Sequence, residues 1–297
     1  MRYTTTPKFD EYYLPKTIEE AISLLARYGK ESKLLAGGTD LLNFMRGGAL
    51  SPKYLIDITR IPGLDHVTVD ETGTLRIGAL ATPKAVAGAE AVKKEWPLLR
   101  EAIIEIGATQ LQNMCTVVGN ISRASPSADS APALLVLDAS VVIKGPSEIR
   151  IVPLQEFFTG PGETVLNENE IVAEIRLPRL PARAGTAFLK LTRVAEDLAK
   201  VNVASLLVVQ DGGCKEARIS LGGVAPTPMR AKKAEEVLKG NQLDDGLITL
   251  AAETAASETR PITDVRSTAE YRKEVSKVLV GRAIKLSWER VQGREGG

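Results

Sequence analysis

Lys33-Leu34-Leu35-Ala36-Gly37-Gly38-Thr39-Asp40-Leu41-Leu42 is the stretch from which the fold can be worked out. It begins as a short apolar run, passes through two glycines, and ends in a polar pair before a new apolar segment. That order predicts a strand, a tight turn and the start of a helix or structured loop. Because glycine has no Cβ, the turn can reach positive φ and lie flat against a ligand.

Several N–H groups of such a turn can point into one concavity, which suits a diphosphate or a similar anion. We expect the Asp40 side chain to turn away from the anion and to accept N–H bonds of its own segment. The alternative is a Gly-Gly turn that joins two buried elements and binds no ligand. Taken by itself, the stretch favours that alternative.

Size and composition indicate a globular protein of two or more domains. The chain has 297 residues, of which 44% are apolar and 25% charged; such lengths usually divide. A net charge of +1 gives no field that would attract nucleic acid or an anionic membrane. No apolar segment approaches the roughly 18 residues of a membrane span, and the N-terminus lacks the apolar core of a signal peptide. Since Cys115 and Cys214 lie far apart, we expect a cytoplasmic protein without disulfides.

The inventory of reactive side chains excludes several kinds of chemistry. His66 is the one histidine, in an alternating pattern that predicts a solvent-facing strand position. With no second histidine and no cysteine cluster, a zinc or iron site ligated by this chain is not expected. Gly-x-Ser-x-Gly, Walker and Gly-x-Gly-x-x-Gly motifs are absent from the sequence. A chain so poor in catalytic groups takes its chemistry from an organic cofactor or carries out none.

Helical and strand patterns alternate through the first 178 residues. Thr17 caps a helix that Gly29 ends, and Thr82-Pro83 begins a helical region that continues to Gly107. The strands expected here cover residues 54–58, a hairpin over 66–79, and residues 139–143, 149–152 and 171–177.

Residues 116–130 form a second informative stretch, crowded with small hydroxyl, amide and carboxylate side chains and without lasting periodicity. We predict an irregular segment between core elements. Its backbone groups must be satisfied by water, as in a surface loop, or by a ligand.

The connector at residues 178–185, rich in Pro, Arg and Gly, is the best domain boundary in the sequence. Beyond it, residues 186–191, 201–209 and 214–221 are expected to be strands of a three-stranded antiparallel sheet. Helices are expected over residues 231–238, 247–258 and 271–290. The prediction is an α+β protein with one domain over 1–178, subdivided near residue 57, and a smaller α+β domain over 185–297.

Three motifs in register resemble those of a known family. Leu-Leu-Ala-Gly-Gly-Thr-Asp-Leu at 34–41, Thr-Val-Val-Gly-Asn-Ile at 116–121 with Asp129 downstream, and the segment 188–201 resemble the FAD-binding subunits of molybdenum hydroxylases. These include the medium subunit of carbon monoxide dehydrogenase and the FAD domain of xanthine dehydrogenase. The resemblance spans nearly the whole chain and implies a vanillyl-alcohol-oxidase-type FAD fold of two α+β subdomains, followed by a C-terminal domain.

The resemblance also assigns cofactor contacts. It implies that the glycine turn wraps the diphosphate with backbone N–H groups, that residues of the second motif continue that cradle, and that Asp129 accepts hydrogen bonds from a sugar hydroxyl. Val172 would lie against the adenine or ribose, and Lys190 would reach the flavin ring, where a cation stabilises negative charge on the reduced ring. The full set implied is Leu34, Leu35, Ala36, Gly37, Gly38, Thr39, Asp40, Leu41, Ile106, Thr116, Gly119, Asn120, Asp129, Val172 and Lys190.

The chain departs from the family pattern in three places. Val118 replaces the first glycine of a Gly-Gly pair; if that position needs positive φ, valine costs about 1–3 kcal/mol, and we expect a weakened contact with FAD retained. Ile106 occupies a place where some relatives have an aromatic residue near the isoalloxazine ring. The cysteine-rich insertion of 4-hydroxybenzoyl-CoA reductase flavoprotein subunits is missing, so no iron–sulfur cluster is expected on this chain.

The resemblance implies an electron-transfer subunit. A large subunit with the molybdenum cofactor would hydroxylate the substrate, a small subunit with two [2Fe–2S] clusters would relay electrons, and the FAD on this chain would pass them to NAD⁺, a quinone or another acceptor. A dimer of heterotrimers is expected. Two alternatives remain open: a self-contained flavin oxidoreductase, with Glu196 or Asp197 as its acid, and a non-catalytic adaptor in which Val118 has closed the site.

Overall fold

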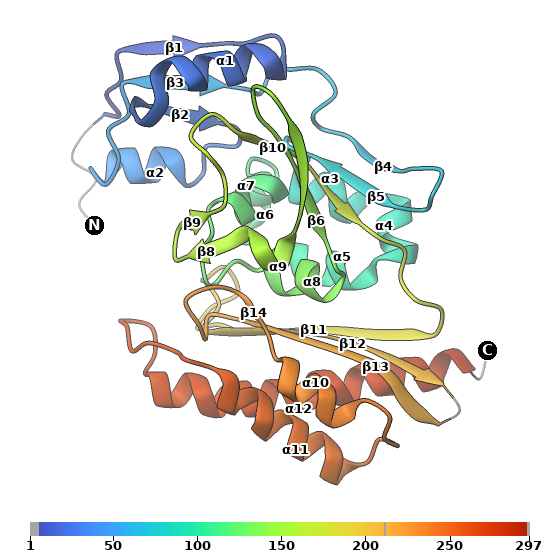
Figure 1. The fold of residues 1–297 in the computed structure, drawn as a ribbon. Coiled ribbons are helices and arrows are strands. Elements are labelled where there is room, and N and C mark those ends of the chain that lie inside the picture. Colours follow the sequence, from blue (N-terminus) through green and yellow to red (C-terminus); the bar gives the residue numbers. More distant parts are fainter. Residues whose placement is uncertain (1–5, 211, 296–297) are drawn as a thin grey trace.

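The computed structural model describes residues 6–210 and 212–295 and arranges them around three principal sheets. In Figure 1 the chain passes from a small sheet, through a five-stranded sheet with its helices, to a four-stranded sheet backed by three helices. None of the helices in the described ranges is both long and apolar enough to cross a membrane.

The N-terminal sheet is parallel, in the order β1-β3-β2, and consists of β1 (Glu11–Tyr13), β2 (Ser32–Leu35) and β3 (Tyr54–Asp57). The helix α1 (Ile18–Tyr28) packs on it, as its period of apolar residues requires. Thr17 Oγ accepts the N–H of Glu20 at 3.1 Å, and Gly29 ends the helix with φ of 49°, so both predicted caps are confirmed. The 3₁₀ turn η1 (Gly29–Glu31) and helix α2 (Leu41–Arg46) complete this part.

The middle sheet is antiparallel, in the order β4-β5-β10-β6-β7. Its strands are β4 (Val67–Val69), β5 (Leu75–Gly78), β6 (Ser140–Lys144), β7 (Ile149–Pro153) and β10 (Ile171–Leu177). The central strand β10 is almost wholly buried and changes register between Val172 and Glu174. A two-stranded antiparallel ribbon of β8 (Phe158–Gly160) and β9 (Glu163–Thr164) precedes β10 in the chain.

The helical region expected from residue 82 to residue 107 is divided into short helices. Ala89 is extended between the first two, and Trp96 leaves the helical region because Pro97 follows it. Trp96 is fully buried and donates from Nε1 to the carbonyl of Pro178 at 3.0 Å. The helices of this half are α3 (Pro83–Gly88), α4 (Glu90–Glu95), α5 (Pro97–Ile103), α6 (Thr109–Gln112), α7 (Val117–Ser122), α8 (Ser130–Val136) and α9 (Leu154–Phe157).

The prediction that residues 116–130 are irregular throughout is wrong for the first part. Residues Val117–Ser122 are the helix α7, which Thr116 caps by accepting the N–H of Gly119 at 2.9 Å. Val117, Val118 and Ile121 bury one face of this turn and a half. Two weak helix formers, Gly119 and Asn120, conceal that spacing in the sequence. Since Val118 is helical and absent from the residues with positive φ, the cost expected for valine does not arise.

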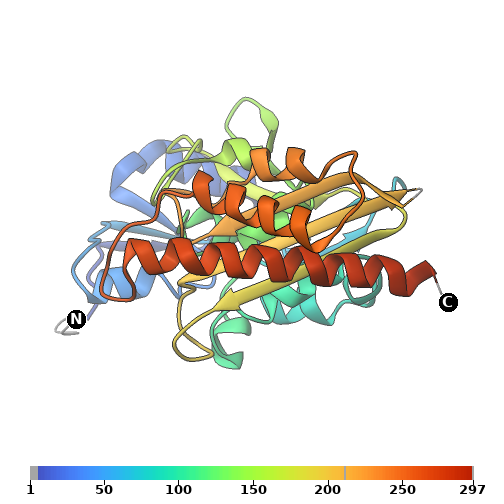
Figure 2. The same ribbon diagram turned by 90° about the horizontal axis from the view of Figure 1, so that it is seen from below.

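The C-terminal sheet is antiparallel and has four strands, one more than predicted. They are β11 (Ala184–Leu191), β12 (Val201–Gln210), β13 (Gly213–Gly222) and β14 (Met229–Arg230). The two residues of β14 are too short to give a periodic signal. Helices α10 (Lys232–Leu238), α11 (Asp245–Glu258) and α12 (Ala269–Glu295) lie across one face of this sheet in Figure 2.

The four-stranded sheet lies between two hydrophobic clusters and contributes side chains to both. Phe188 and Leu206 belong to the cluster of the first half, which fills the space toward α5 and α8. Val203 and Leu207, on the opposite face, belong to the cluster under α10, α11 and α12. This alternation is the period of a strand buried on both sides. The division into 1–178 and 185–297 stays a prediction.

Candidate cofactor-binding site

The glycine turn after β2 lies directly against the segment that precedes α7. A Cβ built on Gly37 would stand 2.1 Å from the carbonyl oxygen of Met114 and 2.7 Å from the Cα of Cys115. Both of these are backbone atoms, so only glycine permits this approach. Gly38 has φ of 69°, the positive φ expected for the turn. The two informative stretches of the sequence are therefore neighbours in space.

Backbone hydrogen bonds fix the chain on both sides of the glycine turn. The N–H of Ile58, just after β3, donates to the carbonyl of Leu35 at 3.0 Å. Leu42 N–H donates to Gly38 at 3.0 Å, which begins α2. Asp40 precedes that helix with helical φ and ψ of −90° and −50°, and its side chain makes no capping hydrogen bond. The expected cap is wrong because a capping side chain reaches its N–H groups from an extended backbone.

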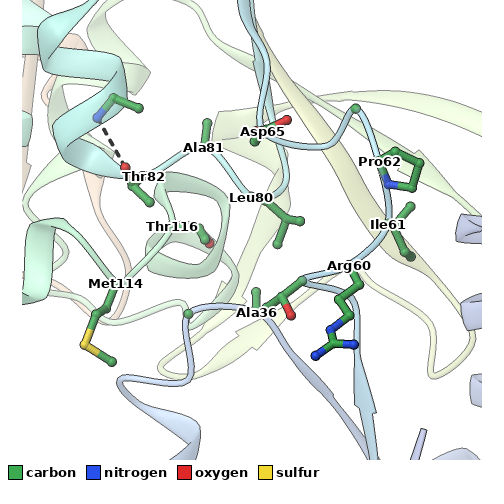
Figure 3. Close-up of a pocket in the computed structure, with 14 residues that line it drawn as sticks. Ala36, Arg60, Ile61, Pro62, Asp65, Leu80, Ala81, Thr82, Met114 and Thr116 are labelled. Atoms are coloured by element: carbon green, nitrogen blue, oxygen red, sulfur yellow. Dashed lines mark hydrogen bonds between the residues drawn. The ribbon is translucent and has the colours of Figure 1, made fainter. Parts of the chain in front are cut away.

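A cavity of about 720 Å³ opens where these segments meet (Figure 3). This volume lies in the range of small-molecule and cofactor sites, roughly 300–1,000 Å³. Of the residues implied by the resemblance, Ala36, Gly37 and Thr116 line it. The other lining residues are Thr59, Arg60, Ile61, Pro62, Gly63, Asp65, Leu80, Ala81, Thr82, Ala85 and Met114.

Sequence reasoning missed the segment 59–65 and the segment 80–85. The first directly follows β3, and ligands in α/β proteins bind beyond the carboxyl ends of parallel strands. Applying that rule to the strand expected at 54–58 would have found it. The second carries the Thr82-Pro83 helix start and is tied to α7, because Val117 N–H donates to the carbonyl of Ala81 at 3.0 Å.

The polar side chains of the second motif are engaged within the protein. Thr116 Oγ is the cap of α7, and a Cβ on Gly119 would stand 2.8 Å from it. Asn120 Oδ1 accepts the hydroxyl of Ser130 at 2.6 Å. Thr116 therefore lines the cavity while its hydroxyl caps α7. Asn120 binds Ser130, the residue that follows Asp129.

Asp129 and Lys190 form an ion pair removed from water. Lys190 Nζ donates to Asp129 Oδ2 at 2.9 Å and to the carbonyl of Glu105 at 2.7 Å. Their side chains are 3% and 7% exposed, so Lys190 does not face solvent. Burial raises the pKa of Asp129 to about 6, although Lys190 and the amide of Asn202, at 3.2 Å, act in the opposite direction. Lys190, which the resemblance implies at the flavin, thus lies in the interior against Asp129 and the carbonyl of Glu105.

The segment from Ala124 to Asp129 is satisfied by the C-terminal sheet and by the β8–β9 ribbon. Gly223 N–H donates to the carbonyl of Pro126 at 2.7 Å, and Gly162 N–H donates to Ala124 at 2.9 Å. Asp129 is 5% exposed. This segment therefore connects the C-terminal sheet and the β8–β9 ribbon inside the protein, and the alternative of a surface loop is wrong for it.

Apart from Ala36, Gly37 and Thr116, the implied residues lie outside the cavity lining, Asp129 and Lys190 included. Val172 and Ile106 are buried in the first hydrophobic cluster, 4% and 7% exposed. Leu34, Leu35, Thr39 and Leu41 are half-buried around the turn. The cofactor contacts assigned to all of these stay predictions.

Side chains considered for other chemistry are spread apart. His66 is 27% exposed and faces Gly63 O at 2.8 Å and Glu174 Oε2 at 3.3 Å, so the expectation that it points at solvent is wrong. Glu196 is exposed, and Asp197 pairs with Arg193 at 3.4 Å. Within residues 6–210 and 212–295, no three His, Cys, Asp or Glu side chains gather in a way that could hold a metal ion.

Comparison with known proteins gives matches along almost the whole chain. Residues 7–180 match the family model of the FAD binding domain in molybdopterin dehydrogenase, and residues 186–286 match that of the CO dehydrogenase flavoprotein C-terminal domain. The carbon monoxide dehydrogenase medium chain of Hydrogenophaga pseudoflava is 34% identical, over 96% of this chain and 98% of the relative. The xanthine dehydrogenase FAD-binding subunit of Escherichia coli O157:H7 is 31% identical, over 93% and 95%.

The fold of almost the whole chain also matches a solved structure. A chain of the carbon monoxide dehydrogenase from Hydrogenophaga pseudoflava that lacks the Mo-pyranopterin moiety of the molybdenum cofactor superposes with a TM-score of 0.94. That chain is 35% identical, and the match covers 96% of this chain and 99% of that one.

Proposed function

The chain belongs to the family of FAD-binding medium subunits of molybdenum hydroxylases, and from that premise we propose that it carries the FAD through which such a complex delivers electrons to an external acceptor. The observation that carries the proposal is the contact between the glycine turn and the segment before α7. Gly37 touches the backbone of Met114 and Cys115, and the cavity begins at that contact.

The residues present fit a dinucleotide. Small side chains such as Ala36, Ala81 and Ala85 leave room in the cavity, and the glycine turn offers backbone N–H groups without Cβ atoms in the way. In the proposed arrangement, residues 34–41 and Thr116, Gly119 and Asn120 hold the diphosphate. Asp129 accepts a sugar hydroxyl of the same cofactor.

At the flavin end, the chain supplies a fixed positive charge. Bound FAD provides the redox chemistry, accepting and releasing electrons. Lys190 is held by Asp129 and by the carbonyl of Glu105, so its position is set before the cofactor arrives. A cation at that place favours negative charge on the ring, and Asp129 moderates the effect.

The proposed partners follow from the family to which the chain belongs. With one histidine and two distant cysteines, it offers no ligand set for iron–sulfur clusters or molybdenum. The proposed partners are a small subunit with two [2Fe–2S] clusters and a large subunit with the molybdenum cofactor, assembled as a dimer of heterotrimers. The proposed acceptor is NAD⁺ or a quinone.

The test is native mass spectrometry of the purified complex together with its flavin content. We expect one FAD per copy of this chain, two partner masses, and iron and molybdenum in the assembly. A colourless chain without bound flavin contradicts the proposal. Turnover of a small organic substrate by this chain alone would instead support a self-contained flavin oxidoreductase.

A further inference from the structure

Arg60 is presented at the tip of a turn that the structure fixes from several sides. Ile61 N–H donates to the carbonyl of Ile58 at 3.1 Å, which closes the turn. Thr59 N–H donates to Asp57 Oδ1 at 2.7 Å, and the Asp57 carboxylate also accepts the hydroxyl of Tyr12. The turn directly follows β3, so Arg60 stands at the same carboxyl edge of the parallel sheet as the glycine turn.

Arg60 is exposed, lines the cavity, and has no side-chain hydrogen bond or ion pair with the residues that the structure describes. Asp57, three residues earlier, is buried and already accepts two hydrogen bonds. The hydrogen bond to Asp57 raises the pKa of Tyr12 to about 12, and the positive charge of Arg60 acts against that rise. The five donors of Arg60 are therefore free for a ligand.

Charge is distributed unevenly around the cavity. In Figure 3, Arg60 lies on the side of Ala36, where the chain enters the glycine turn, and Asp65 lies on the opposite side near Ala81. An anionic group is attracted toward the Arg60 side and repelled from the Asp65 side. Ala36, at the start of the glycine turn, lines this same end, and glycine turns commonly bind anions through their backbone N–H groups.

We propose that Arg60 binds the diphosphate of the dinucleotide, by donating to its non-bridging oxygens across the cavity from the glycine turn. This inference rests on the proposed function and names a residue that the three motifs do not contain. A guanidinium suits the role because its planar donors match two phosphate oxygens at once. The adenosine part then lies away from Arg60.

The experiment compares ligands that differ only in the diphosphate. Full-length chain freed of flavin is titrated with ADP and with adenosine, for the unaltered chain and for Arg60→Ala, Arg60→Lys and Arg46→Ala. Arg46 is an exposed arginine at the end of α2 that does not line the cavity, so it is the matched control. Because Arg60 is exposed, its substitution leaves the fold intact, and the melting temperature without ligand checks this.

We expect Arg60→Ala to weaken ADP binding by roughly 10- to 100-fold, the loss of a charge-assisted contact, and to leave adenosine within twofold. Arg60→Lys retains part of the affinity for ADP, and Arg46→Ala changes the affinity for neither ADP nor adenosine. Added salt reduces the difference in ADP affinity between the unaltered chain and Arg60→Ala. Unchanged ADP binding in Arg60→Ala overturns the inference, and so does an equal loss of ADP and adenosine. If the unaltered chain binds neither FAD nor ADP, the proposed function itself fails.

Discussion

At the scale of single residues, the buried ion pair of Lys190 and Asp129 makes the stability of the chain depend on pH. A buried pair stabilises a fold little, but removal of one partner leaves the other charge without compensation. Asp129 has a folded pKa of about 6, above its ordinary value of 3.8. Between about pH 4 and 6 the folded chain therefore binds more protons than the unfolded chain, and stability falls as Asp129 ionises.

Lys190→Met is expected to make that loss of stability larger and to extend it to higher pH. Without the ammonium, the ionised Asp129 carboxylate is buried alone, and the free energy of unfolding decreases by about 3–5 kcal/mol at pH 8. At pH 5, where Asp129 is mostly protonated, the decrease is smaller. Urea unfolding of both chains at the two pH values measures this. Lys277→Met, which breaks an exposed pair with Glu253, is the control and should change stability little at either pH. An equal decrease in the free energy of unfolding at pH 5 and pH 8 would contradict the conclusion that Lys190 compensates the ionised Asp129.

Val118→Gly, which restores the residue expected from the family pattern, is predicted to harm the protein. Val118 is 5% exposed, helical, and packed in the first hydrophobic cluster. Loss of its side chain and of helix propensity should lower the free energy of unfolding by about 2–4 kcal/mol. The affinity for FAD should not improve. Thermal melts and flavin titration of the variant measure both; tighter FAD binding would show that valine does obstruct the cofactor.

Individual residues were predictable where backbone requirements alone decide them. Gly38 needs positive φ and Thr17 caps a helix, and both signals are local. The partners of Lys190 lie at positions 105 and 129, so its burial depends on contacts that no local pattern contains. Arg60 was missed for the same reason, because its importance comes from the cavity beside it.

At the scale of elements, the site depends on how closely the glycine turn approaches the segment before α7. Gly37→Ala would press a methyl group into the carbonyl of Met114, and backbone cannot move aside as a flexible side chain can. We expect a loss of about 1–3 kcal/mol in stability and at least a tenfold weaker affinity for FAD.

The matched control for Gly37→Ala is Gly88→Ala. A Cβ on Gly88 meets no atom within 4 Å, and the residue is the last of α3, without a positive φ. It should leave FAD affinity unchanged and stability unchanged or slightly higher. Flavin fluorescence titration and urea unfolding of both variants decide the matter. Equal FAD affinity in the two variants would mean that the contact at Gly37 does not shape the site.

Elements with strong local signals were predicted well, and those shaped by packing were not. The helix α1 carries caps and a clear period, and the strands β11, β12 and β13 are apolar runs bounded by turn residues. The helix α7 was missed because Gly119 and Asn120 hide its buried face. Only the surrounding core makes that short segment helical.

At the scale of the whole molecule, the four-stranded sheet joins the two hydrophobic clusters. Since Phe188 and Leu206 complete the first cluster while Val203 and Leu207 complete the second, neither half can lose its structure without exposing the other. The sequence showed the connector and the strands. It could not show that one sheet serves both cores, because a strand buried on two sides looks like any other apolar run.

The two tryptophans allow this shared core to be tested. Trp96 is fully buried in the first cluster, and Trp288 packs against the second. In Trp288→Phe and Trp96→Phe, the remaining tryptophan reports one half each. We expect the fluorescence and circular dichroism midpoints to coincide within each variant, and saturating FAD to raise both. Two separate transitions in either variant would show that the halves unfold independently.

An experimental density map of the cofactor-loaded chain would show where the FAD diphosphate binds. We predict that both phosphate groups lie between Gly37–Gly38 and the residues from Thr116 to Gly119, at the cavity beside Arg60. A diphosphate bound elsewhere on the chain, or contacting only one of the two segments, would contradict it.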